Sequence, residues 1–296
     1  MKKSYLILHT AVLLAGFTGV FGKLIALNEL TLVWYRVLFA SIILFFILKS
    51  YKLKGLQSFS EIAKISKAGI LITIHWIFFY ASIKYSNISI GVVCYCLTSF
   101  FTAIFEPIIN KKKFNLVQGL LSLFTLLGIS LIFHFDSSYQ LGILLGVISS
   151  AFAALYTIYN EKLVQFYDSK LINFYQMLGG TIVLGLTLPI YFYYFPEESF
   201  IPSLKDTFYL FVLASCCTVA LYVMFAESLK KIPAFTVNLT FNLEPIYAII
   251  LAFLFFDEGK SINFSFYIGI SLIMTSILLQ SLISIKKRNV VEEPIS

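Results

Sequence analysis

Long apolar runs, separated by short polar breaks, fill most of this 296-residue chain. A helix needs roughly 17–25 apolar residues to cross the hydrocarbon core of a bilayer. The strict alternation of apolar and polar residues that is typical of a membrane barrel does not occur in these runs. The pattern therefore predicts ten membrane-spanning helices, over residues 5–22, 31–48, 68–83, 88–109, 115–134, 141–160, 171–194, 207–228, 233–256 and 264–284.

The composition agrees with an all-α integral membrane protein. Hydrophobic residues make up 59% of the chain and charged residues only 12%, against about 25% charged residues in an average soluble domain. A soluble domain of this length needs a more charged surface, and a disordered chain needs low hydrophobicity. The first apolar run continues to Gly22 without a clear cleavage site, so we expect an uncleaved first span and not a signal peptide.

The basic residues are distributed unevenly between the loops. With the N-terminus inside, seventeen of the 22 lysines and arginines fall in inner segments and four in outer segments, while Arg36 lies within a span. Cytoplasmic loops of membrane proteins carry this kind of excess, so we expect both termini to be cytoplasmic. The formal net charge of +7 then reflects topology and contact with anionic lipid headgroups, and no nucleic-acid partner is needed to account for it.

The chain resembles itself in two halves, 1–135 and 140–296, joined at residues 134–138. Residues 34–38 of the second span (WYRVL) correspond to residues 174–178 of the seventh (FYQML), which pairs Arg36 with Gln176. Each half holds five spans, and an odd number places the second half upside down relative to the first. Inverted repeats are a recurrent transporter architecture, with the substrate site near the midplane between the halves.

Two five-helix halves in about 300 residues resemble the bacterial ten-helix EamA-type branch of the drug/metabolite transporter superfamily. The resemblance is carried by Tyr35-Arg36-Val37-Leu38-Phe39-Ala40, Tyr80-Ala81-Ser82, Leu243-Glu244-Pro245-Ile246, Asp257-Glu258 and the tenth span with Gly269. The first half departs from the pattern, because Phe100 stands where a proline would align with Pro245. Lys112-Lys113 likewise replaces the acid that would align with Glu258. The resemblance implies a secondary transporter in a bacterial inner membrane, and an amino acid or related compound is its leading substrate class.

Two spans carry matched polar stripes. Gly91, Tyr95, Ser99, Thr102 and Glu106 follow one another in span four at helical spacing, and Thr236, Thr240, Glu244 and Tyr247 do so in span nine. On a continuous helix each set shares one face. Such hydroxyls can also serve helix packing, but two acids on equivalent faces favour a central cavity. Two prolines inside these spans, Pro107 and Pro245, predict kinks beside the acids.

The two acids differ in depth. Glu244 follows about eleven residues of span nine, which places it roughly 16 Å from the start of the helix and near the midplane. A charged residue at that depth is costly and usually faces a cavity or a partner. We therefore expect Glu244 to contact the substrate or a coupling proton. Glu106 lies nearer the cytoplasmic end, where it can reach water or pair with the lysines at 111–113.

Four further residues are candidates with open alternatives. His75 can be a cavity donor or proton acceptor, or a buried neutral histidine, and Trp76 beside it can stack on a flat solute. Arg36 can bind an anion or pair with a glutamate, or it can extend to the interface beside Trp34-Tyr35. Gln176 is its neutral counterpart in the second half.

Enzyme chemistry has little support in this sequence. It contains no phosphate loop, zinc-protease motif or nucleophile elbow, and the spacing of its four cysteines resembles neither a disulfide framework nor a zinc site. We expect no metal or cofactor. The sequence predicts a non-enzymatic exporter of a small polar metabolite, working by alternating access as a monomer or weak homodimer. Export of nucleobase- or drug-like solutes and a non-transporting accessory role are the alternatives.

Overall fold

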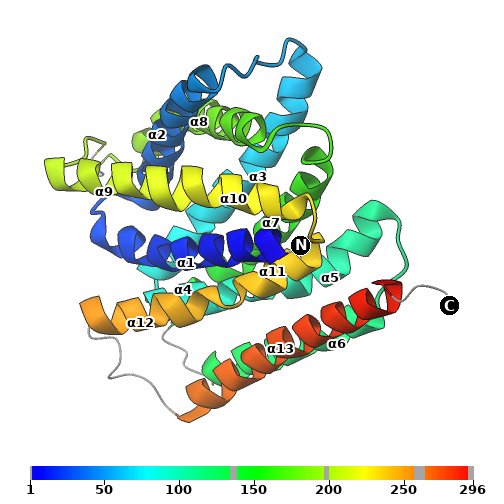
Figure 1. The fold of residues 1–296 in the computed structure, drawn as a ribbon. Coiled ribbons are helices and arrows are strands. Elements are labelled where there is room, and N and C mark those ends of the chain that lie inside the picture. The colour runs from blue at the N-terminus through cyan, green and yellow to red at the C-terminus, as the bar shows by residue number, and fades with distance from the viewer. Residues whose placement is uncertain (1, 134–138, 197–199, 257–263, 293–296) are drawn as a thin grey trace.

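The computed structural model describes residues 2–133, 139–196, 200–256 and 264–292. The predicted linker at 134–138 and the Asp257-Glu258 pair lie outside these ranges. Within them every regular element is helical, as predicted (Figure 1). In chain order the elements are α1 (Lys2–Leu24), α2 (Glu29–Ser50), α3 (Phe59–Lys84), α4 (Ile88–Tyr95), α5 (Leu97–Asn110), α6 (Leu116–Phe133), α7 (Gln140–Leu163), α8 (Ser169–Tyr194), α9 (Leu204–Ala214), the π-helix η2 (Ser215–Ala220), α10 (Leu221–Leu229), α11 (Ala234–Phe241), α12 (Glu244–Phe256) and α13 (Phe264–Glu292).

These elements form the ten predicted membrane segments. Eight segments are long and apolar enough to cross a bilayer, and the shorter apolar stretches Leu116–Leu131 and Tyr267–Leu279 supply the other two. In the tenth segment α13 continues to Glu292, eight residues past the predicted end. The other predicted limits hold within a few residues except in the third segment. That helix begins at Phe59 and not near residue 68, because the polar turns of its first part continue the helix beyond the apolar run.

Three segments are not single α-helices, although the sequence predicted continuous spans. The fourth breaks at Cys96 between α4 and α5, and the ninth breaks at Asn242-Leu243 between α11 and α12. In the eighth, six residues of π-helix separate α9 from α10. Of the two prolines expected to kink their spans, Pro245 adjoins the break between α11 and α12, whereas Pro107 lies inside α5, eleven residues after the break in its segment.

Each helix of one half makes the same kind of contacts as the corresponding helix of the other half. The first helix of one half, α1, packs against α10 and α12, and its counterpart α7 packs against α3, α4 and α5. Counterparts also pair directly: α2 lies against α8, and α6 lies beside α13 at the edge of the bundle (Figure 1). This reciprocal pattern is the one expected of two five-helix repeats related by an approximate two-fold axis.

Local sequence determines several of the helix ends. Asn28, Asn87, Asp168 and Ser203 each cap a helix by accepting a hydrogen bond from a backbone N–H of the first turn. Between helices, Gly69 lets α3 approach α8 closely, because a Cβ there would lie 2.2 Å from the backbone oxygen of Gln176. These contacts hold α3, which carries two of the candidate residues.

Candidate functional site

The two broken segments cross each other at their breaks. The helix before the break in each segment packs against the helix after the break in the other: α4 contacts α12, and α11 contacts α5. At the crossing the Cys96 thiol lies 3.9 Å from the backbone oxygen of Asn242. Pro245 contributes to the second break because it has no N–H, and the carbonyl of Phe241 therefore loses its usual helical partner. Broken helices of this kind leave polar backbone groups where a membrane protein can bind a solute.

A small cavity, the central pocket, adjoins this crossing. Six helices supply its walls, and aromatic side chains make up half of its lining. Its volume is about 20 Å³, which is on the scale of one water molecule. The lining residues are Ala15, Thr18, His75, Trp76, Phe79, Tyr95, Leu221, Tyr222, Phe241 and Glu244.

Among the described residues, Glu244 is the only acid that lines the central pocket. It is the first residue of α12 and is 5% exposed. Within the described ranges its carboxylate forms no hydrogen bond or ion pair. The N-terminus of a helix carries a partial positive charge that favours a carboxylate, and Arg36 is the charged side chain whose field reaches it. The helix N-terminus and the charge of Arg36 thus favour the ionised carboxylate of Glu244, although no described group bonds to it directly.

Arg36 lies behind the wall of the pocket and is completely buried. Its guanidinium donates to Thr218 Oγ1 at 2.8 Å, to the backbone oxygen of Cys217 at 2.8 Å and to the Tyr80 hydroxyl at 2.9 Å. Its charged carbon also lies 3.8 Å from the centroid of the Trp76 ring. These contacts exclude the alternative in which Arg36 extends to the interface.

The π-helix explains how Arg36 finds these acceptors. Both Cys217 and Thr218 lie in η2, and the wider turn leaves the Cys217 carbonyl available to the guanidinium. The Thr218 hydroxyl in turn donates to the backbone oxygen of Leu213, five residues earlier. Sequence reasoning missed both residues, because apolar periodicity does not distinguish a π-turn from an α-turn.

His75 and Trp76 project from α3 into the lining of the pocket. The His75 Nδ1 atom lies 2.8 Å from Ser149 Oγ and 3.1 Å from the Ser149 backbone oxygen. Trp76 donates through its indole N–H to the Tyr222 hydroxyl at 3.1 Å. The His75 ring also faces that of Tyr95, with 5.3 Å between centroids. The structure therefore brings four predicted candidates, His75, Trp76, Tyr95 and Glu244, into one site.

Ser99 and Thr102 lie elsewhere, contrary to the expectation of one continuous stripe. The Ser99 hydroxyl is 3.2 Å from the Asn242 amide, and Thr102 Oγ1 accepts from Asn238 at 2.7 Å. Asn238 also accepts from Thr157 of α7 at 3.0 Å. We call this set the α5–α7–α11 contact. The break at Cys96 is the reason for the difference, because helical periodicity does not carry from α4 into α5.

The remaining candidates also lie outside the central pocket. Thr240 donates to the backbone oxygen of Thr236, and Tyr247 packs against Gly16 of α1. Gln176 is buried and bonded to Tyr156 and Asn160. Glu106 pairs with Lys112 at 3.2 Å, as its position near the end of the segment allowed.

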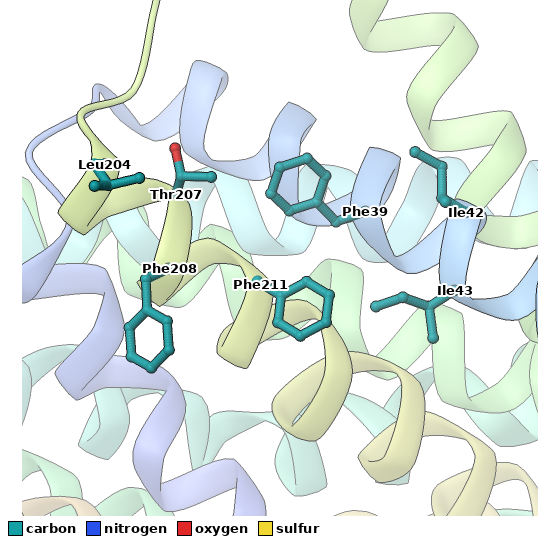
Figure 2. A pocket seen from close by; sticks show the side chains of 7 residues that line it. All are labelled: Phe39, Ile42, Ile43, Leu204, Thr207, Phe208 and Phe211. Carbon is teal, nitrogen blue, oxygen red and sulfur yellow. The ribbon is translucent and has the colours of Figure 1, made fainter.

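A second, larger groove on the molecule is chemically different. It lies between α2 and α9, has a volume of about 610 Å³ and is lined by six apolar side chains and Thr207 (Figure 2). Its Leu204 and Phe208 are 89% and 63% exposed. On a chain that spans a membrane, apolar side chains this exposed face lipid tails, so the groove offers a polar solute no recognition.

Comparison with known proteins identifies relatives of this chain. A sequence model of the EamA-like transporter family matches residues 2–134 and 140–282. The chain is 24% identical over 278 residues to an uncharacterized transporter of Clostridium kluyveri, covering 89% of this chain and 88% of that protein. It is 26% identical over 238 residues to an uncharacterized transporter of Haemophilus influenzae, covering 76% and 74%.

A solved crystal structure shares the fold, with a TM-score of 0.74 and 13% sequence identity, over 95% of this chain and 98% of the other. The family match extends through both halves of the chain, including the segments that form the central pocket. The chain belongs to the EamA-like transporter family.

Proposed function

We propose that this transporter moves a small polar metabolite by alternating access, as an exporter, and that the central pocket is its substrate site. The observation that carries the proposal is the buried Glu244 carboxylate, which has no partner among the described residues and lines a small pocket where two broken helices cross. An intramembrane acid is costly to keep unless it serves binding or coupling. Discontinuous helices at the repeat interface are a recurrent location of transporter substrate sites.

The size of the pocket supports alternating access. A volume of about 20 Å³ cannot hold a metabolite, so helices must move apart before a solute can enter. On the face where α1 and α11 begin, the α5–α7–α11 contact closes the way with hydroxyl and amide hydrogen bonds. Water can replace such bonds when the helices separate, whereas α4 and α12 close the opposite side.

Glu244 can hold a substrate cation or a proton, but not both at once. If protonation favours one orientation of the site and substrate the other, a proton gradient drives net transport. Arg36 supplies a fixed positive charge nearby and leaves the region neutral when Glu244 is ionised. The same arrangement therefore supports proton coupling.

A second candidate function follows from the aromatic walls. Trp76, Tyr95 and Tyr222 line the central pocket, where the Trp76 and Tyr222 rings meet edge to face. Flat solutes stack on aromatic rings. A nucleobase- or drug-like solute would use these rings and depend less on Glu244.

We also propose that both termini are cytoplasmic and that the membrane is a bacterial inner membrane. The seventeen-to-four distribution of basic residues supports this orientation. It places the α5–α7–α11 contact on the cytoplasmic side. Two predictions remain untested: the repeat limits of 1–135 and 140–296, and the oligomeric state of a monomer or weak homodimer.

A metabolite screen of flux in proteoliposomes, with and without a pH gradient, tests the proposal. We expect Glu244→Gln to reduce gradient-driven accumulation at least about tenfold, since a lost charge-assisted contact exceeds 1.4 kcal/mol. Glu106→Gln is the matched control, because that acid already pairs with Lys112 near the end of its segment, and we expect a change below about twofold. Equal flux and equal pH dependence in the wild type and Glu244→Gln would contradict the proposed role.

A further inference from the structure

The hydrogen-bond polarity of the central pocket narrows the class of solute that fits it. An ionised carboxylate only accepts hydrogen bonds, and within the described ranges nothing donates to that of Glu244. Buried acceptors are costly when they have no donor. While Glu244 is ionised, a ligand that enters the pocket must therefore bring a donor to it.

The contacts of His75 give the pocket a second acceptor. The backbone oxygen of Ser149 can only accept, and it lies 3.1 Å from His75 Nδ1, so Nδ1 carries the proton. The Ser149 hydroxyl donates to the His75 backbone oxygen at 3.0 Å and is a second acceptor for the same N–H. No carboxylate within the described ranges pairs with this buried ring, and a neutral ring protonated at Nδ1 has a lone pair at Nε2. Ser149 thus holds His75, which lines the pocket, in the tautomer whose Nε2 can accept a hydrogen bond.

Fixed donors in the pocket are already engaged. The Trp76 indole N–H is bonded to Tyr222, and the hydroxyls of Thr18, Tyr95 and Tyr222 can serve as donor or acceptor. Arg36 does not line the pocket. It is fully buried, three of its N–H groups have protein acceptors, and Trp76 covers its face. A ligand carboxylate would therefore meet Glu244 without a free cation to balance it.

We infer that the central pocket recognises a protonated primary amine through its N–H groups and discriminates against α-amino acids that carry a free carboxylate. The inference rests on the proposed function and departs from the amino-acid class that the family resemblance implies. Glu244 and His75 accept from the ammonium, while Trp76, Tyr95 and Tyr222 surround its positive charge. A quaternary ammonium satisfies the aromatic faces but leaves both acceptors without donors.

Three probes with the same carbon skeleton test this inference on the purified full-length protein. They are 3-methylbutylammonium, its N,N,N-trimethyl derivative and leucine, which adds a carboxylate to the primary amine. Calorimetric titration should give affinities at least about tenfold higher for the primary amine than for either of the others, because each of the others loses a charge-assisted contact or adds an uncompensated charge.

The His75→Phe variant sharpens the test, because it retains a ring and removes the acceptor. The preference for the primary over the quaternary amine should fall by about tenfold, with little change for the quaternary probe. A quaternary probe or leucine that binds wild type as tightly as the primary amine would overturn the inference. So would the absence of binding by all three probes in a protein that transports another solute, whereas loss of all solute flux would count against the proposed function itself.

Discussion

The two broken membrane segments are alike in backbone and different in chemistry. Both begin with a helix of eight residues, α4 and α11, and the breaks that follow lie 146 positions apart. At this offset Tyr95 corresponds to Phe241, and both line the central pocket. At the same offset Thr98 corresponds to Glu244. The backbone break is therefore common to both halves, whereas the acid belongs to one.

The two equivalent positions, Thr98 and Glu244, differ in whether they reach the central pocket. The Thr98 hydroxyl is buried and has no hydrogen-bond partner in the part of the chain that the structure describes, and Thr98 does not line the pocket. Glu244, at the equivalent position, places a carboxylate in the pocket at the start of α12. The repeats can thus form the crossing symmetrically, and one half alone supplies the charged recognition group.

Locking the crossing should produce the largest effect. Thr102 and Asn238 are hydrogen-bonded across α5 and α11 at 2.7 Å. With the four native cysteines replaced by alanine, Thr102→Cys combined with Asn238→Cys should lose all transport on oxidation and regain it on reduction. Proteoliposome flux measures the effect, and each single cysteine variant is its control. Full transport by a protein shown to be cross-linked would mean that these helices need not separate.

The two prolines offer a smaller and more discriminating test. Pro245→Ala supplies an N–H to the Phe241 carbonyl and favours joining α11 to α12. Joining the helices gains roughly one hydrogen bond, so the broken form needed for transport becomes less stable by that amount. We therefore expect transport to slow by about three- to tenfold. Pro107→Ala adds an N–H inside α5, which is already continuous. That variant should melt at a higher temperature and transport within about twofold of wild type. Equal effects of the two substitutions on flux would show that the break at α12 is not special.

Much of this fold could be predicted from the sequence, because lipid imposes a simple pattern on a spanning helix. Run lengths identified all ten segments, and the correspondence between residues 34–38 and 174–178 identified the repeat. The break at Cys96 escaped prediction because the residues around it remain apolar or small enough for a helix, and tertiary contacts such as those between α4 and α12 stabilise it. The break at Asn242-Leu243 adjoins the kink that Pro245 predicted, although its exact position was not predicted.

The candidate site was predictable in part for a related reason. Glu244, His75, Trp76 and Tyr95 were identified from their chemistry and depth, and the structure brings them together. Ser99 and Thr102 were assigned to the same cavity by extending one helical period through a break. Tyr222 and Ser149, which orient Trp76 and His75, lie in other segments, and no local pattern links them to α3.

The central claim is that the pocket beside Glu244 binds the transported solute, and Trp76 can report it directly. The chain has two tryptophans, so Trp34→Phe leaves Trp76 alone in the pocket wall. Titration with the solute found by the flux screen should change Trp76 fluorescence saturably. Adding Glu244→Gln should raise the midpoint at least about tenfold, and adding Thr98→Val should change it less than about twofold. A transported solute that leaves Trp76 emission unchanged, or binds with the same midpoint in the Glu244→Gln protein, would contradict the account.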